Sequence, residues 1–229
     1  MERKKIVVLT GAGISAESGI KTFRDADGLW EGHDIMEVAS PEGFEKNPAL
    51  VLDFYNQRRQ QLKEVHPNEG HKALVALEKK YDVTIITQNV DNLHERAGSS
   101  NIIHLHGELV KSRSTIAPYK IYDCTKDIVL GDFCENEAQL RPHIVWFGEA
   151  VPMIETAITE CLLADILIII GTSMQVYPAA SLIDYVPKNT PIYFIDPNPA
   201  VPNSFYKNLT VISENGSVGV PKVVDLLIH

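Results

Sequence analysis

Short apolar runs that end at small or polar residues recur along the chain and predict buried β-strands. They span 6–9, 83–87, 102–105, 166–170, 192–195 and 210–212. Helical patterns separate several of these runs and span 48–65, 68–81, 152–164 and 221–228. Apolar strands that alternate with helices are typical of a parallel sheet covered on both faces. The pattern therefore predicts an α/β fold with a Rossmann-like parallel sheet, in which ligands lie at the carboxyl ends of the strands.

Two segments interrupt this alternation and predict a smaller inserted module. One segment follows the first strand and contains no buried-strand pattern, and the other, in the middle of the chain, is polar and broken. Residues 1–229 are expected to form a single domain. Within it we expect a small module of about 24–67 and 107–144 beside a core of about 1–23, 68–106 and 145–229.

Composition and charge narrow the class of protein. Of the 229 residues, 45% are hydrophobic and 22% are charged, which is typical of a globular domain and excludes intrinsic disorder and a coiled coil. The longest purely apolar runs, of which Ile166–Ile170 is one, are far shorter than the ~20 residues of a membrane helix. The first strand pattern starts so close to Met1 that we expect no signal peptide and a cytoplasmic protein. A net charge of −9 argues against nucleic-acid binding.

A glycine-rich turn follows the first predicted strand. Gly11, Gly13 and Ala16 form a Gly-x-Gly-x-x-Ala pattern, which lets phosphates approach the backbone at a helix N-terminus. The alternative is a tight turn that binds nothing. A dehydrogenase needs a second strand that ends in Asp or Glu about 20 residues further on, whereas this chain has a loop there and its next strand starts at Val83.

Five motifs then follow one another along the chain. They read GAGIS (11–15) with SGI (18–20) and FR (23–24), TQNVDNLH (87–94), HLHG (104–107), RPHIVWFGE (141–149) and GTSMQVYP (171–178). Together they resemble the signatures of the sirtuins, the NAD-dependent protein-lysine deacylases, over nearly the whole chain. The resemblance implies that NAD is a co-substrate, consumed rather than reduced, and that acyl-lysine proteins or peptides are the partners.

The resemblance also implies which residues bind NAD. Phe23 and Arg24 are expected in a loop over the dinucleotide, and Asp91 is expected to recognise the nicotinamide carboxamide. Asparagine and aspartate could instead simply cap a turn. The implied NAD-binding residues are Gly11, Ala12, Gly13, Ser15, Ala16, Ile20, Phe23, Arg24, Gln88, Asp91, His106, Gly171, Thr172 and Ser173, with Asp196, Asn198 and Gly216 on the adenosine side.

His106 and Asn89 are the expected catalytic residues. A histidine titrates near neutral pH and can accept a proton from a hydroxyl group. In sirtuins the histidine that matches His106 is the general base, which activates a ribose hydroxyl, and the asparagine lies beside the reacting ribose. The implied products are lysine, nicotinamide and O-acyl-ADP-ribose. His104, two residues earlier in the predicted strand, is the local alternative to His106.

The substrate peptide is expected to lie extended between two backbone segments. The resemblance places these segments at Gly148-Glu149 and Val176-Tyr177, where an added strand gains affinity from main-chain hydrogen bonds. It also places Val145, Phe147 and Val176 around the acyl-lysine, although Val145 could equally be a core residue.

Tyr55 and Arg58 predict the acyl specificity. They are three residues apart in a predicted helix and therefore share a face. A phenol and a guanidinium together can bind a carboxylate, and this pair resembles the one in bacterial class III sirtuins that act on succinyl-, malonyl- or glutaryl-lysine. The alternative is a solvated arginine beside a packed tyrosine. Arg59, about 100° further round the helix, is expected to face solvent.

The chain departs from the family pattern in the small module. Most sirtuins hold zinc there with four cysteines, whereas this chain offers only Cys124 and Cys134 between Gly107 and Arg141. We therefore expect no metal, and a module held by apolar packing. Lys21 also replaces the usual proline, so the loop over NAD should be looser. The residues expected to pack in the module are Ile116, Tyr119, Ile121, Tyr122, Ile128, Leu130 and Phe133.

Two other functions use the same NAD site. An ADP-ribosyltransferase or NAD hydrolase has no need of a group that binds an acyl carboxylate, so Tyr55 and Arg58 argue against it. A non-catalytic sensor of NAD or ADP-ribose has no need of His106, Asn89 and Asp91 together. We expect a deacylase of acidic acyl groups that retains some deacetylation, and a monomer.

Overall fold

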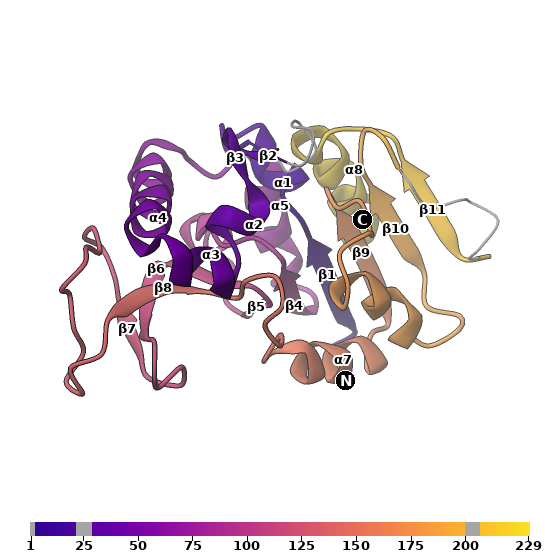
Figure 1. The fold of residues 1–229 in the computed structure, drawn as a ribbon. Helices are drawn as coiled ribbons and strands as arrows, with labels where there is room; N and C mark the ends of the chain where they lie inside the picture. The colour runs from indigo at the N-terminus through magenta and orange to yellow at the C-terminus, as the bar shows by residue number, and fades with distance from the viewer. Residues whose placement is uncertain (1–2, 22–28, 200–206) are drawn as a thin grey trace.

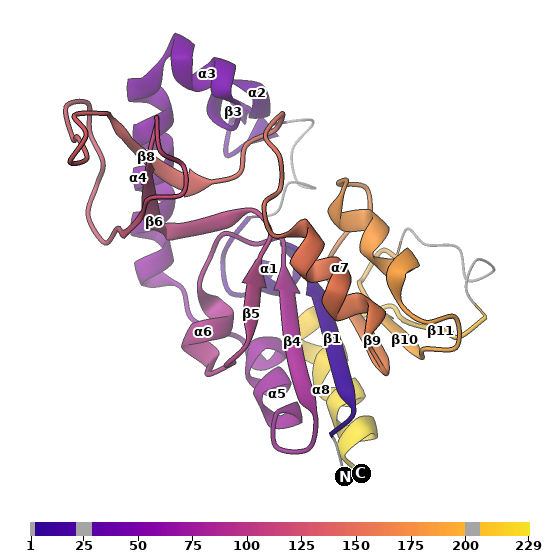
Figure 2. The same cartoon turned by 90° about the horizontal axis from the view of Figure 1, so that it is seen from below.

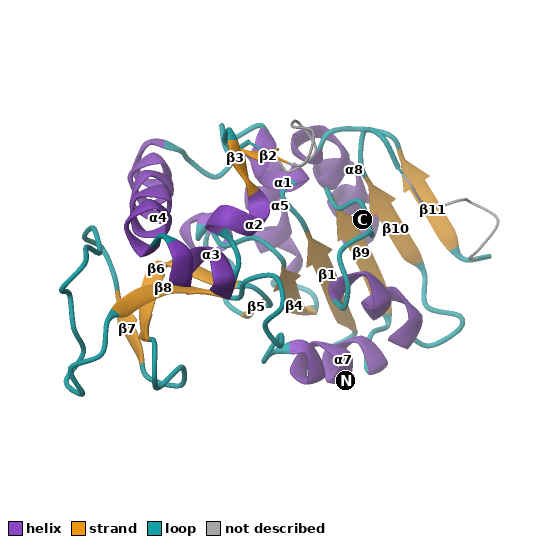
Figure 3. Ribbon diagram, in the orientation of Figure 1, coloured by secondary structure: helices purple, strands orange, loops and turns teal. Residues whose placement is uncertain are grey.

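The computed structural model describes residues 3–21, 29–199 and 207–229, and a six-stranded parallel sheet forms its centre (Figures 1 and 3). The strand order is β11-β10-β9-β1-β4-β5. The strands span Lys5–Thr10 (β1), Asp82–Thr87 (β4), Ile102–His104 (β5), Ile166–Ile170 (β9), Ile192–Ile195 (β10) and Leu209–Ile212 (β11). Each of the six apolar runs forms one of these strands, so the predicted fold class is confirmed.

Helices cover both faces of this sheet (Figure 2). The side chains of β1 alternate between the faces, since Val7 and Leu9 join one core cluster while Ile6 and Val8 join the other. The first cluster is closed by α7 (Ile154–Leu162) and the 3₁₀ helix Ala179–Tyr185. The second is closed by α5 (Glu69–Leu77) and α8 (Gly216–Ile228). Burial on both faces explains why the strands read as continuous apolar runs.

The small module lies beside the carboxyl ends of the strands. Its antiparallel sheet has the order β7-β6-β8, formed by Gly107–Ser114 (β6), Ile121–Asp123 (β7) and Leu140–Ile144 (β8). Its helices are Ile35–Val38 (α2), Pro41–Lys46 (α3) and Pro48–Glu64 (α4), preceded by a short hairpin, Leu29–Trp30 (β2) and His33–Asp34 (β3). The short helices Gly13–Ala16 (α1) and Leu93–Ala97 (α6) follow β1 and β4.

Helix α4 begins where the sequence predicts. The Asn47 side chain accepts a hydrogen bond from the amide of Leu50 (3.1 Å), and Pro48 occupies the first helical position. Because α4 carries Tyr55 and Arg58, this start fixes the position of both side chains.

Arg59 does not face solvent, so that expectation was wrong. Its side chain is buried, Nε donates to the carbonyl of Leu109 (2.9 Å) and Nη1 donates to Asn56 Oδ1 (2.7 Å). The reason is that β6 and the segment around Ile128 pack on the side of α4 that a lone helix would leave open.

The expected apolar packing of the small module was also largely wrong. Ile128 is buried against Leu52 and Cys124, but the other expected large apolar residues are exposed or, for Tyr122, half-buried. A sheet of such short strands buries little side-chain surface beyond what α4 covers. The exposed residues are Ile116, Tyr119, Ile121, Leu130 and Phe133. Over the described ranges, no helix is long and apolar enough to cross a membrane.

Candidate active site

A cavity of about 410 Å³ joins the core to the small module at the carboxyl ends of the strands. Loops that follow β1, β4 and β9 contribute to its wall, and these strands are neighbours in the sheet. The predicted residues of these loops that line it are Gly11, Ala12, Gly13, Ser15, Ile20, Gln88, Asn89, Asp91, Gly171, Thr172 and Ser173, with His106 just before β6. Its size lies within the range usual for ligand sites.

The glycines of the first motif allow two backbones to touch. A Cβ atom on Gly13 would lie 2.6 Å from Gly171 Cα, and one on Gly11 would lie 2.8 Å from the Gly171 carbonyl oxygen. The Gly13 amide donates to that same carbonyl (2.8 Å), and the Ser15 amide donates within the turn. The amides of this four-residue helix are therefore less free to bind phosphate than the sequence pattern predicts, and the glycines serve close packing of the two loops.

The second motif forms a buried polar cluster around Ser15. Its hydroxyl donates to Asp91 Oδ2 (2.9 Å) and accepts from Asn89 Nδ2 (3.2 Å). Asp91 also accepts from the amide of Leu93 (3.0 Å), and burial raises the pKa of its carboxyl group. Gln88 donates from Nε2 to Thr172 Oγ1 (3.1 Å), which links this loop to the one after β9. The bonds fix both side chains that the sequence assigns to the nicotinamide and the ribose.

His106 is held in the tautomer that a base requires. Its Nδ1 lies 3.0 Å from the carbonyl oxygen of Gln88. A carbonyl can only accept, so Nδ1 carries the hydrogen and the neutral ring keeps a lone pair on Nε2. Burial lowers the pKa of His106 below its ordinary value, which keeps the ring neutral at pH 7.

His104 has different surroundings and does not line the cavity. Its Nε2 lies 2.6 Å from Glu95 Oε1 and its Nδ1 lies 3.3 Å from the carbonyl oxygen of Asn89. Burial lowers the pKa of His104, but the carboxylate of Glu95 raises it, and the net shift is upward. A protonated histidine in an ion pair is a poor base, so the geometry favours His106.

Helix α4 and the segment after β8 form another part of the cavity wall. Tyr55 is fully buried, and burial raises its pKa well above the ordinary value in spite of the hydrogen bond that its hydroxyl accepts from Trp146 Nε1 (3.0 Å). Arg58 lies over the Phe54 ring at 4.7 Å. The predicted substrate residues that line this side are Tyr55, Arg58, Val145, Phe147, Gly148, Glu149, Val176 and Tyr177.

Arg58 carries polar atoms without partners. Its Nε and Nη1 are buried and make no hydrogen bond within the described ranges. Burial lowers the pKa of Arg58, which the carboxylates of Glu31 and Asp53 partly oppose. A guanidinium in such a position can bind an anion that enters the cavity.

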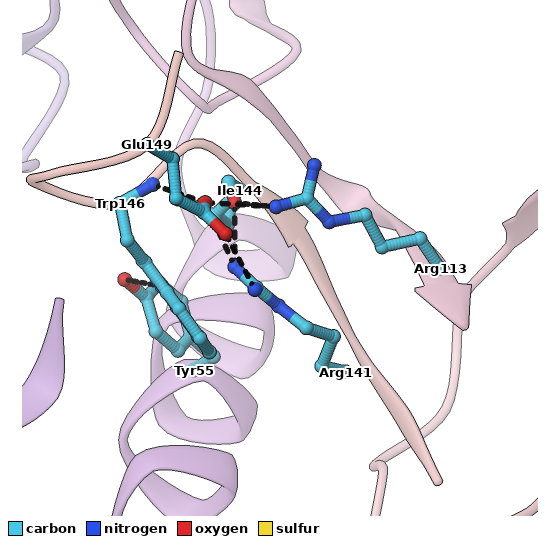
Figure 4. A network of polar contacts seen from close by, with 6 residues as sticks. All are labelled: Tyr55, Arg113, Arg141, Ile144, Trp146 and Glu149. Atoms are coloured by element: carbon cyan, nitrogen blue, oxygen red, sulfur yellow. Dashed lines mark hydrogen bonds and ion pairs between the residues drawn. The ribbon is translucent and has the colours of Figure 1, made fainter. Parts of the chain in front are cut away.

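Glu149 ties the segment after β8 to the small module (Figure 4). Its carboxylate accepts from Arg141 Nη1 (2.8 Å), from Arg113 Nη2 (2.8 Å) and from the amide of Trp146 (2.8 Å). The Arg141 guanidinium lies 3.2 Å from the centroid of the Trp146 ring. The side chain of Glu149 therefore supports the segment from within, a role that its motif position did not reveal.

Several predicted NAD-binding residues do not line this cavity. They are Ala16, Asp196, Asn198 and Gly216, while Phe23 and Arg24 lie outside the described residues. Asp196 is buried and bonds the amide of Asn198 (2.8 Å). The adenosine-side roles of Asp196, Asn198 and Gly216 stay predictions, as do the NAD-binding roles of Ala16, Phe23 and Arg24.

Other residues line the cavity that the sequence patterns did not assign to it, above all Lys21, Trp30, Glu31 and Trp146. Trp146 stands between two predicted residues of its motif. Glu31 precedes Gly32, and that glycine was the sequence signal of a turn.

The small module does not fit a structural zinc site. Such a site needs four ligands, whereas Cys134 Sγ donates to Ser114 Oγ (3.4 Å) and Cys124 Sγ donates to the carbonyl of Lys126 (3.3 Å). Within the described part of the chain, the one group of three potential ligands is Glu95, His104 and Glu108, outside this part of the module. The absence of zinc stays a prediction.

The fold and the site define a Rossmann-like α/β protein whose cavity extends into an inserted module. A model of the Sir2 family matches residues 11–178. The chain belongs to the Sir2 family.

Named relatives and solved structures agree with this assignment. An NAD-dependent protein deacylase of Helicobacter pylori strain J99 is 59% identical over 229 residues, which cover 99% of this chain and 96% of the relative. One from Bacteroides thetaiotaomicron is 54% identical over 98% of each chain. The crystal structure of a Sir2 homologue in complex with NAD has a TM-score of 0.87 at 37% identity, and covers 99% of this chain and 90% of that chain.

Proposed function

We propose that the chain is an NAD-dependent protein-lysine deacylase that removes succinyl and malonyl groups and retains some deacetylation. One observation carries the acyl preference: Arg58 lines the cavity that also holds His106, and two of its guanidinium nitrogens have no hydrogen-bond partner in the described part of the chain. A carboxylate at the end of an acyl chain would give this guanidinium the anionic partner that it lacks. The relatives named as deacylases support the reaction itself.

The donor set around the cavity fits NAD. It combines a carboxylate, carboxamides, hydroxyl groups and an imidazole within one wall. Asp91 and Asn89, fixed through Ser15, would hold the nicotinamide carboxamide and the ribose. When bound, NAD supplies the ribose carbon that receives the acyl oxygen, and nicotinamide leaves.

His106 acts as the general base in this proposal. Its free Nε2 accepts the proton of a ribose hydroxyl while Nδ1 stays bonded to the Gln88 carbonyl. The ring therefore holds the proton at Nε2 without losing its orientation.

The peptide lies across the mouth of the cavity. Phe147 and Tyr177 are exposed there, and Gly148, with φ of 89°, turns its segment in a conformation that favours glycine. Val145 and Val176 line the path of the acyl-lysine. The products are lysine, nicotinamide and O-acyl-ADP-ribose.

Acetyl-, succinyl- and malonyl-lysine peptides test this proposal, with and without NAD. We expect His106→Ala to abolish NAD-dependent release of every acyl group. We expect Arg58→Met to lose desuccinylation while it keeps much deacetylation. His229→Ala and Arg3→Met are matched controls, because both residues are exposed and outside the cavity.

Two outcomes would contradict the proposal. Equal loss of both activities in folded Arg58→Met protein excludes the acyl-carboxylate role. NAD cleavage without transfer of any acyl group indicates the alternative NAD hydrolase. Metal analysis of the purified protein tests the absence of zinc, and about one Zn per chain would overturn it.

A further inference from the structure

Glu31 occupies a backbone position that its side chain does not favour. It forms the turn of hairpin β2–β3 together with Gly32, since Trp30 pairs with His33. The φ angles are 51° at Glu31 and 85° at Gly32. Two-residue turns with positive φ at both positions strongly prefer Asn, Asp or Gly. A glutamate held in this conformation suggests a role for its side chain.

Aromatic contacts fix the hairpin against α4. The Trp30 ring packs edge-on against Phe54 at 4.8 Å and against Tyr55 at 5.9 Å. The His33 ring packs against Phe54 at 5.6 Å. Because Phe54 also carries the guanidinium of Arg58, at 4.7 Å, these rings place the turn next to Arg58.

The carboxylate of Glu31 belongs to the cavity. Only 14% of its side chain is exposed, and Glu31 lines the same space as Tyr55 and Arg58. Lys21 Nζ lies 3.1 Å from Glu31 Oε2 and also lines the cavity. In the described part of the chain no ion pair joins Glu31 to Arg58, but the negative charge of Glu31, more than that of Asp53, opposes the lowering of the Arg58 pKa by burial.

We propose that Glu31 sets the preference of the enzyme between neutral and acidic acyl groups. This inference rests on the proposed function of Arg58. A neutral acyl group that fills the cavity would bury the guanidinium without a counter-charge, and Glu31 supplies part of one. The same carboxylate repels the carboxylate of a succinyl or malonyl group. Glu31 therefore favours deacetylation relative to desuccinylation.

The test compares kcat/KM for succinyl-lysine and acetyl-lysine peptides of one sequence. We expect Glu31→Gln to raise the succinyl-to-acetyl ratio about five-fold, through a lower KM for the succinyl peptide. Glu31→Asn should raise it as well, and it suits the turn better, so a fault in folding cannot explain agreement between the two variants. Lys21→Met removes the cation that pairs with Glu31, so the succinyl-to-acetyl ratio should fall.

Asp53→Asn is the matched control. Asp53 lies on α4 and also interacts with Arg58, but it is exposed and does not line the cavity. We expect less than about a two-fold change in the ratio. An unchanged or lower ratio in both Glu31 variants, or equal changes in Glu31→Gln and Asp53→Asn, would overturn the inference. Arg58→Met separates the two proposals: if it leaves the wild-type ratio intact, the role of Arg58 itself is wrong.

Discussion

At the scale of single residues, the hydrogen bonds around one imidazole define the chemistry. His106 donates from Nδ1 to a main-chain carbonyl, and His104, two residues earlier, pairs with a carboxylate. The same residue type is thus kept neutral at one position and favoured in its charged form at the other. In the proposed mechanism, the environment of each ring rather than its residue type distinguishes the base.

The pH dependence of the reaction should follow His106. A general base works when it is deprotonated, and burial lowers the pKa of this histidine. We therefore expect kcat/KM for an acetyl peptide to stay constant as the pH falls through about 6.5, the ordinary value for histidine, and to decline only below it. A pH profile measured with saturating NAD checks this, and an acid limb centred at or above pH 7 would contradict it.

Glu149 shows how one side chain serves several neighbours. We expect Glu149→Gln to lower the free energy of unfolding by about 2–4 kcal/mol, because it leaves Arg141 and Arg113 without their carboxylate. Urea unfolding measures the change. Glu155→Gln, on the exposed side of α7, should change it by less than about 0.5 kcal/mol, and similar values for the two variants would rule out the bonding role of Glu149.

At the scale of elements, the site depends on loops from neighbouring strands that pack against each other. The turn after β1 and the turn after β9 touch through Gly13 and Gly171. The loop after β4 joins them through Gln88 and Thr172. Three separate sequence motifs therefore form one rigid wall.

Gly13→Ala should push apart the two loops that touch at Gly13 and Gly171. The added Cβ would meet backbone rather than a flexible side chain, so we expect a loss of about 1–3 kcal/mol in unfolding free energy and a higher KM for NAD. Ala97→Gly, in the short helix α6 and outside the cavity, is the control for altered flexibility. An unchanged KM for NAD in Gly13→Ala would show that the close contact does not shape the site.

At the scale of the whole molecule, buried histidines make the fold sensitive to acid. Burial lowers the pKa of His71 and of His143 to about 4 and lowers that of His94 well below its ordinary value. The unfolded chain takes up protons on these groups near pH 6.5, and the folded chain does not. His104, whose pKa is raised, acts in the opposite direction but is a single group.

Stability should therefore fall as the pH is lowered from about 7 towards 4. Urea unfolding at pH 7.5 and pH 5 measures the loss. His71→Gln should reduce this dependence if it folds, while His229→Ala, at the exposed C-terminus, should not. A higher unfolding free energy at pH 5 than at pH 7.5 would contradict the prediction.

The sequence was sufficient for the sheet because its strands are buried on both faces and read as uninterrupted apolar runs. It was also sufficient for the loops after β1, β4 and β9, where motifs and strand ends coincide. It did not predict the burial of Arg59, because the helix pattern does not show that β6 packs on the face of α4 that carries this residue. Glu31 escaped notice for a related reason, since only packing of the hairpin on α4 brings it to the cavity.

The acceptor that orients His106 is a peptide oxygen, which has no proton equilibrium of its own. When an acidic side chain holds a histidine ring, the ionisations of the two groups are coupled, and the observed pKa values describe the two groups together. Here the imidazole titrates alone. Its protonation in acid should consequently follow a simple one-site curve, and the same curve should appear in the NMR shift of the ring and in the rate of turnover.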